Sequence, residues 1–217
     1  MTPVLDAVQE ELIRIPPAPP PDGGEGPRPP GPAGEPAVSN ARLGMLVFLA
    51  FEAMFFAGLL GAYLVLRLGS AVWPPPGEPY LPIAVTWGNT GILLFSSYNV
   101  RRARRAIRQD NRQAFARWLL LTAIYGVTFL GVQGYEWVRL VRFGLSVSGT
   151  YGSTFYTLIG THALHVLGAV CWLLAVLALA RLRRFSAQRH TAVRVCGMYW
   201  HFVVAVWPFL FVLVYLL

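Results

Sequence analysis

The sequence predicts an all-α membrane protein, a bundle of five transmembrane helices whose N-terminus is cytoplasmic and whose C-terminus lies outside. Three observations predict it. Of the 217 residues, 55% are hydrophobic and only 13% are charged, which falls outside the range of soluble globular proteins. Five apolar runs are long enough to form spans, and arginines cluster beside them. The net charge of +8 therefore indicates membrane topology, and we expect no nucleic-acid partner.

Residues 1–40 are predicted to form a cytoplasmic tail, separate from the transmembrane domain at 41–217. Most of the 17 prolines lie in this tail, and residues 16–36 lack the apolar side chains needed for a core. Within 4–15, apolar residues recur at nearly helical spacing. A short amphipathic helix lying on a partner or on the membrane surface and a marginal isolated helix both remain open. We expect no signal peptide, because no basic region precedes a short apolar core.

The first apolar run, 43–66, carries one carboxylate, Glu52, near its middle. About 20 helical residues, at roughly 1.5 Å each, cross a hydrocarbon layer of roughly 30 Å. The run can therefore span the membrane and place Glu52 near the midplane. A charged carboxylate facing lipid there costs roughly 2.5 kcal/mol or more, so Glu52 must face protein, be paired or be protonated.

Four further runs follow a proline-rich loop that cannot continue the first helix. They are predicted at 81–100, 118–140, 155–179 and 195–217. The run at 81–100 is the shortest. Its glycines, threonines and serines are residues that let membrane helices approach closely.

Polar side chains interrupt these later runs. They are Gln133 and Glu136 in the third run, His162 and His165 in the fourth, and His201 in the fifth. Counting roughly 1.5 Å per residue places Glu52 and His165 near the midplane, Glu136 and His162 in the outer third, and His201 in the cytoplasmic third. A Glu52–His165 contact is therefore the first predicted pair, and Glu136–His162 is the second.

These groups could transfer protons or bind metal, or they could hold helices together at roughly 0.6 to 2 kcal/mol per hydrogen bond. Haem ligation needs histidines on facing helices, whereas His162 and His165 share one helix face. A copper or iron centre needs three or four converging ligands, and the three intramembrane histidines lie at different depths. We therefore expect no metal. Cys171 and Cys196 lack a CxxC partner and are interpreted as packing residues.

Arginines are concentrated in the segments after the second and fourth runs. They are Arg101, Arg102, Arg104, Arg105, Arg108, Arg112 and Arg117, followed by Arg181, Arg183, Arg184, Arg189 and Arg194; the other side has Arg67, Arg139 and Arg142. The positive-inside rule places the arginine-rich side in the cytoplasm. The run 101–108 could also bind anionic lipid head groups. Arg101, Arg102, Arg104, Arg105 and Trp200 are the head-group candidates.

Five motifs occur in order on the five predicted spans. They are 51-FEAMFFAGL-59, 89-NTGILLFSS-97, 129-FLGVQGYEW-137, 155-FYTLIGTHALHVLG-168 and 199-YWHFVVAVW-207. Together they resemble the successive span motifs of subunit III of haem-copper oxidases, in the short five-helix bacterial form. The resemblance covers residues 42–217. By motif, the polar residues named above match the family's own, and Tyr199, Trp200 and His201 open the last motif.

This resemblance implies an accessory, non-redox subunit of a proton-pumping cytochrome c oxidase in aerobic respiration, located in the bacterial inner membrane. Such a subunit packs on catalytic subunit I, binds phospholipid in a cleft and supports proton uptake. Subunit II and a small subunit IV or another respiratory complex are further expected partners. Haem and copper are expected in those partners, and this chain is expected to hold no cofactor, metal or catalytic residue.

Two departures from the family pattern keep other readings open. Val204 stands where the family commonly has an acid, and Pro208, which could kink the helix, stands where an apolar residue is usual. A subunit III-like component of a nitric oxide reductase or quinol oxidase is one alternative. An independent transporter or proton channel using Glu52 and Glu136 is another. The chain shows no inverted repeat or pair of broken helices to favour that last reading.

Overall fold

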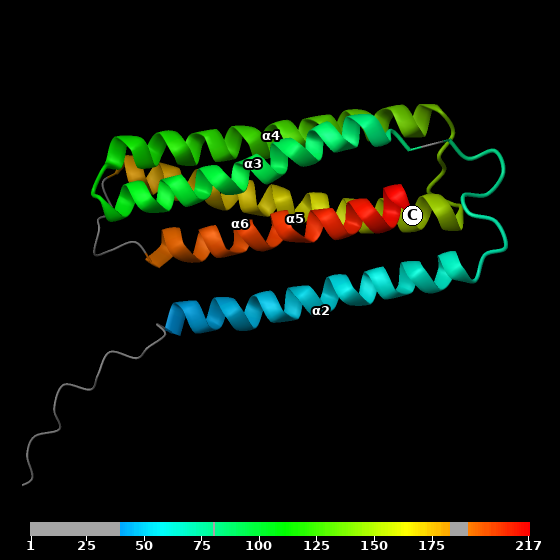
Figure 1. The fold of residues 1–217 in the computed structure, drawn as a ribbon, viewed down its shortest axis with the longest axis horizontal. Coiled ribbons are helices and arrows are strands. Elements are labelled where there is room, and N and C mark those ends of the chain that lie inside the picture. Colours follow the sequence, from blue (N-terminus) through cyan, green and yellow to red (C-terminus); the bar gives the residue numbers. More distant parts are fainter. Residues whose placement is uncertain (1–39, 80, 183–190) are drawn as a thin grey trace, which may run out of the picture. The chain divides into compact units, whose positions relative to one another are not determined.

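A computed structural model describes residues 40–79, 81–182 and 191–217 of the chain. The described part is all-helical. Its elements are α2 (Asn40–Leu68), α3 (Ile83–Arg108), α4 (Arg112–Arg142), α5 (Thr150–Arg181), α6 (Thr191–Leu210) and the π-helix η1 (Phe211–Leu216). Consecutive helices run in opposite directions (Figure 1). The predicted N-terminal tail lies outside the described residues.

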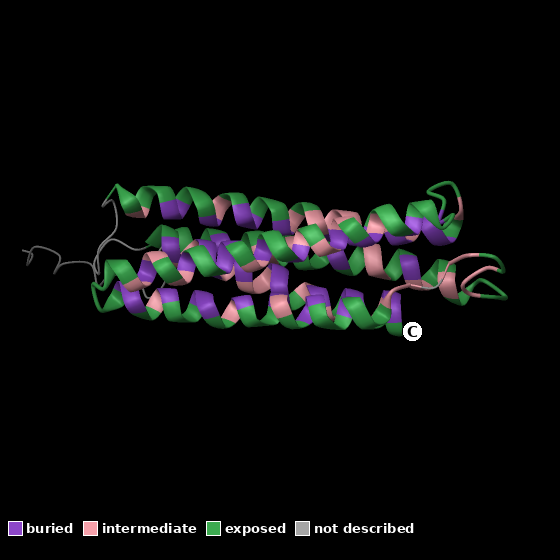
Figure 2. Ribbon diagram, turned by 90° about the horizontal axis from the view of Figure 1, so that it is seen from above, coloured by how far each residue is buried: buried purple, intermediate pink, exposed green. Residues whose placement is uncertain are grey.

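Helices α3, α4, α5 and α6 form a four-helix group in which each contacts two neighbours, and α2 packs along α6 and α5 (Figure 1). The buried residues of α2 are Met45, Phe56 and Tyr63. Their separations are close to whole numbers of helical turns, so they lie in one stripe. Much of the rest of α2 is exposed, and exposed residues are frequent along the outer sides of the bundle (Figure 2). One face of α2 therefore packs on protein, and its remaining surface is available to lipid or a partner.

Four helices of the described part are long and apolar enough to cross a membrane, namely α2, α4, α5 and α6 with η1. Helix α3 does not join them because asparagine, threonine and serine residues make its segment before Arg101 less apolar than the other helices, and beyond that segment it continues through Arg108. The arginines that were expected in a loop after residue 100 thus lie on the helix itself. Arginine is a good helix former, so nothing in 101–108 ends the helix. It ends where Asp110 adopts a φ of 51° and the Asn111 side chain caps α4.

Three side-chain hydrogen bonds join the antiparallel helices α3 and α6. The indole N–H of Trp207 donates to Thr90 at 2.8 Å, that of Trp200 donates to Ser96 at 3.0 Å, and His201 bonds Ser97 at 3.1 Å. The two indoles are seven residues apart on α6, and their partners Thr90 and Ser96 are six residues apart on α3, which is about two helical turns in each case. The small hydroxyl residues predicted to let helices approach closely are thus also hydrogen-bond partners of buried indoles.

A close contact between α4 and α6 depends on a glycine. A Cβ atom added at Gly126 would lie 2.6 Å from the ring of Trp200 and 2.7 Å from Val170. The absent side chain therefore makes room for the buried indole. Further along, Pro208 lies inside α6, and the chain changes to the wider π-helix at Phe211. Proline has no N–H to donate, and a local change of helix type follows it within three residues.

Candidate functional site

The central polar contact lies between α2 and α5. The His165 Nε2 atom is 2.9 Å from Glu52 Oε2, so the pair predicted from depth is present in the structure. The other ring nitrogen, Nδ1, lies 2.7 Å from the carbonyl oxygen of Thr161, one turn earlier on α5. Each side chain is 19% exposed. The pair is therefore partly open at the edge of the contact between these helices.

These two hydrogen bonds fix the number of protons that the pair can hold. The Thr161 carbonyl can only accept, so Nδ1 of His165 must carry a hydrogen. One proton is then shared between Nε2 and Glu52 Oε2. It gives either a neutral carboxylic acid donating to imidazole or an imidazolium donating to carboxylate. The shared proton can move between the two side chains without breaking this hydrogen bond, whereas its release from the pair would break it.

Aromatic rings surround the histidine of this pair. The rings of Phe55 and His165 are stacked with centroids 6.2 Å apart, and the rings of Phe56 and His165 meet edge to face with centroids 5.0 Å apart. These rings limit the water around the pair. A hydrogen bond in such surroundings is electrostatically stronger than one in water.

A second group of polar side chains lies near the end of the bundle that is opposite to the arginine-rich end. Gln133 on α4 donates to the Tyr215 hydroxyl of η1 at 3.1 Å, and both residues are buried. The side chain of Glu136 is only 5% exposed, and Arg139 donates to it at 3.3 Å. The nearby Arg67 of α2 donates to the hydroxyl of Tyr63 and to the carbonyl of Leu213. Polar side chains therefore attach η1 to both α4 and α2.

The second predicted pair, Glu136 with His162, is wrong. Glu136 binds Arg139, whereas His162 is buried among rings, stacked on Trp207 at 5.1 Å and flanked by Phe56 and Phe129. Neither of its ring nitrogens has a hydrogen-bond partner among the described residues. Similar depth suggested the pair, but depth does not fix the direction in which a side chain points around a helix.

The remaining candidates lie towards the arginine-rich end. His201 bonds Ser97, as described above. Trp200, considered as a head-group contact, is 1% exposed and donates to Ser96, so it packs between helices and offers no surface to a lipid head group. Arg102 lies over the rings of Trp118 and Tyr98, at 5.2 and 5.9 Å from their centroids. It therefore contacts the seam between α3 and α4.

Arg101, Arg104 and Arg105 lie together with Arg108 around a cavity of about 170 Å³. Burial, followed by the positive charges of Arg108, Arg194 and Arg42, lowers the pKa of the Arg104 guanidinium below its ordinary value. Three helices thus bring like charges together at this end of the bundle.

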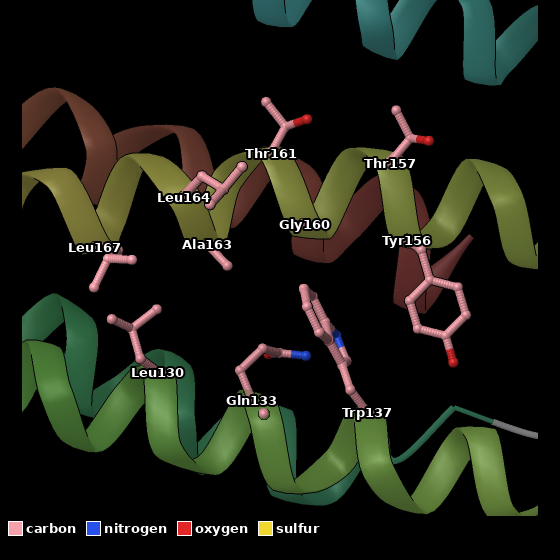
Figure 3. Close-up of a pocket in the computed structure, with 11 residues that line it drawn as sticks. Leu130, Gln133, Trp137, Tyr156, Thr157, Gly160, Thr161, Ala163, Leu164 and Leu167 are labelled. Carbon is pink, nitrogen blue, oxygen red and sulfur yellow. The ribbon is translucent and has the colours of Figure 1, made fainter. Parts of the chain in front are cut away.

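A groove of about 610 Å³ lies between α4 and α5 (Figure 3). Trp137 extends from α4 towards Gly160 of α5, and Leu130, Leu164 and Leu167 line the far end (Figure 3). The volume falls within the roughly 300 to 1,000 Å³ of typical ligand pockets. The groove is mainly apolar, with the Gln133 amide near its middle and the Tyr156 hydroxyl at the opposite end (Figure 3).

Within the described ranges, no three histidine, cysteine, aspartate or glutamate side chains converge in a way that could hold a metal ion. The candidates instead form pairs between helices or contact aromatic rings. Sequence reasoning missed Tyr215 and Ser97, which are the partners of Gln133 and His201. Neither stands out, because a tyrosine or serine in an apolar run is common in membrane helices.

The fold and this site together define an α-helical membrane protein whose intramembrane polar groups are mostly paired between helices. A family model described as "Cytochrome c oxidase subunit III" matches residues 33–217. The cytochrome c oxidase subunit 3 of Thermostichus vulcanus is 39% identical over 176 residues, which cover 81% of this chain and 86% of the relative. That of Synechocystis sp. is 38% identical, covering 80% and 74%.

A probable cytochrome c oxidase subunit 3 of Nocardia farcinica is 37% identical over 176 residues, covering 80% of this chain and 86% of the relative. The chain therefore belongs to the cytochrome c oxidase subunit III family of the haem-copper oxidases. The resemblance seen in the five sequence motifs is confirmed. The names of these relatives describe them as subunits of a cytochrome c oxidase.

Proposed function

We propose that this chain is the accessory, non-redox subunit of a proton-pumping cytochrome c oxidase in a bacterial cytoplasmic membrane. It packs on catalytic subunit I, beside subunit II, and the haem and copper belong to those partners. Family membership over residues 33–217 supports this role. The exposed surface of α2 supplies area for a partner or lipid.

In this proposal the chain crosses the membrane five times, with the start of α2 in the cytoplasm and η1 at the outer face. The part of α3 up to Val100 would extend about 27 Å, close to the roughly 30 Å of the hydrocarbon layer. Arginines at the shared end of α3, α4, α5 and α6 favour the cytoplasm for that end.

Accessibility labelling tests the orientation. Gln109→Cys and Phe143→Cys each place a single thiol in a Cys171→Ser, Cys196→Ala background. The first thiol lies just before α4 and the second just after it. A membrane-impermeant maleimide applied to intact spheroplasts should label the second variant and spare the first until the cells are lysed. The opposite pattern would reverse the proposed orientation, and labelling of both would contradict a spanning α4.

The groove between α4 and α5 is proposed to hold an acyl chain of a phospholipid. Leu164 is 68% exposed and Leu167 is 48% exposed, so the apolar end of the groove opens on the bundle surface. Tyr156 and Trp137 lie at the other end, which the proposed orientation places nearer the outer interface. Such amphipathic rings favour the interface between membrane and water.

The proposal that the subunit supports proton uptake rests on the Glu52–His165 pair. Its hydrogen bonds leave one exchangeable proton, and both side chains are partly exposed. Glu52→Gln keeps a hydrogen-bond partner for His165 but abolishes the carboxylic acid. In the purified complex this variant should retain the subunit while slowing proton uptake during turnover or shortening the active lifetime. Asp110→Asn, which removes an exposed carboxylate, is the matched control.

Isolation of the complex through this chain tests the proposed function as a whole. Gentle solubilisation should recover subunits I and II, with haem a or o bands in a reduced-minus-oxidised spectrum. Haem b together with a reductase subunit would assign the chain to a nitric oxide reductase. Recovery of the chain alone, without haem, would overturn the oxidase proposal.

A further inference from the structure

The strongest unexplained feature of the bundle is the cavity at the end of α3. It is lined by four residues, all of them arginines: Arg101, Arg104, Arg105 and Arg108. Their spacing of three or four residues places them along one side of a helix. Like charges at such spacing destabilise a helix by a few tenths of a kcal/mol per pair. Because the four arginines repel one another, an anion bound in the cavity would lower this repulsion.

Neighbouring helices add to this positive field. The Arg104 stem packs against α6, where a Cβ added at Gly197 would lie 3.3 Å from the Arg104 Cδ atom. Arg42 of α2 and Arg194 of α6 lie close enough to help lower the pKa of Arg104, after burial and Arg108. Glycine at position 197 thus allows the guanidinium to remain beside the bundle. The position of the arginines around the cavity therefore depends on packing against α6 as well as on their spacing along α3.

No acid in the described part of the chain neutralises the four lining arginines. Asp110, the nearest acid in sequence, pairs with Arg112 at 3.6 Å. Glu52 pairs with His165, and Glu136 pairs with Arg139. Arg102, on the same stretch of α3, contacts rings and does not line the cavity. The positive charge around the cavity is therefore available to an external anion.

The length of α3 places this cavity at the level of lipid head groups. The helix has 26 residues, or about 39 Å at the usual rise, against roughly 30 Å of hydrocarbon. The excess corresponds to the turns that carry the arginines. Guanidinium groups bind phosphate oxygens through paired hydrogen bonds, and anionic lipids attract arginines next to a membrane span.

We propose that Arg101, Arg104, Arg105 and Arg108 form a binding site for the phosphate of an anionic phospholipid in the cytoplasmic leaflet. The inference rests on the membrane orientation proposed above, because orientation decides which leaflet supplies the lipid. A cavity of about 170 Å³ suits a small head group. Its position at the membrane surface favours a lipid over a dissolved phosphate.

The test is a titration of the delipidated, purified complex with phosphatidylglycerol, followed by native mass spectrometry. Arg105→Gln with Arg108→Gln removes two exposed lining charges. Arg102→Gln with Arg117→Gln is the matched control, because it removes two exposed charges from the same end, outside the cavity. At about 1 kcal/mol per arginine, the lining variant should weaken phosphatidylglycerol binding roughly thirtyfold. Phosphatidylcholine and inorganic phosphate serve as comparison ligands.

Selective loss of phosphatidylglycerol in the lining variant, with the control unchanged, would support the site. Equal loss in both variants would indicate diffuse attraction and overturn it, as would no loss in either. Equal competition by inorganic phosphate would also contradict a lipid site. If the lining variant loses a partner subunit while its lipid binding is unchanged, the arginines bind protein and the proposal fails. Since the titration exposes both ends of the chain to lipid, an error in orientation would appear only in the thiol labelling.

Discussion

Glu52 on α2 and His165 on α5 share a hydrogen bond of 2.9 Å, although 113 residues separate them in sequence. Helix α2 has few buried residues and lies beside the other four helices. This polar contact therefore joins the least buried helix to the bundle. It also places an acid and a base together inside the membrane, where each would be costly alone.

Two replacements of Glu52 separate the contribution of its hydrogen bond to His165 from that of its carboxylate. Glu52→Gln should leave assembly largely intact, because the amide still hydrogen-bonds His165. Glu52→Leu should lower the stability of the subunit in the complex by about 1 to 3 kcal/mol, because the imidazole loses its partner. Thermal retention of the subunit by the purified complex measures both effects.

A double-mutant cycle supplies the control. Glu52→Leu combined with His165→Leu removes both partners, so its cost should be smaller than the sum of the two single costs. Additive costs would show that the two side chains are not energetically coupled. Loss of the subunit in Glu52→Gln would show that assembly needs the carboxylate itself.

Gly126→Ala should destabilise the contact between α4 and α6. The new methyl group would lie well inside contact distance of Trp200 and Val170, and overpacking of this kind costs about 1 to 3 kcal/mol. Gly131→Ala on the same helix meets no atom within 4 Å and should be neutral or slightly stabilising. Thermal unfolding of the two variants in the same detergent compares them. Equal stability would contradict the close packing.

Thr90→Val should leave the indole N–H of Trp207 buried without an acceptor. The expected cost is roughly 0.6 to 2 kcal/mol, the range of hydrogen bonds between membrane helices. Thr128→Val, an exposed position on α4, is the control and should change stability little. Thr90→Val with Trp207→Phe should cost less than the two single changes summed. If Thr90→Val does not change stability, the hydrogen bonds between α3 and α6 do not stabilise the subunit.

His162→Phe should be tolerated within about 1 kcal/mol, because the imidazole packs among rings without a described hydrogen-bond partner. His162→Ala should cost about 3 kcal/mol through the cavity that it leaves. Subunit retention and oxidase turnover should be measured together. A phenylalanine variant that assembles normally but loses turnover would give His162 a polar role and contradict packing alone.

Several features of this chain follow from its sequence alone. Hydrophobic runs, proline-rich breaks and family motifs predicted the helical membrane fold, because burial of backbone polar groups in lipid requires helices. Depth along each run also predicted the Glu52–His165 pair, since rise per residue is nearly constant. The arginines indicated one end of the bundle. Their helical conformation was missed, because a charged segment was taken to be a loop.

The tertiary structure decided which side chains face one another. Glu136 and His162 lie at similar depths, yet Glu136 binds Arg139 and His162 faces Trp207. Rotation of each helix about its axis determines these partners, and rotation is set by packing such as that of Trp200 against Gly126. The position of a residue along a helix is local information, whereas its direction around the helix depends on every neighbouring helix. The sequence therefore determined which segments are apolar helices and which polar residues they carry, and only packing decided how those residues were paired.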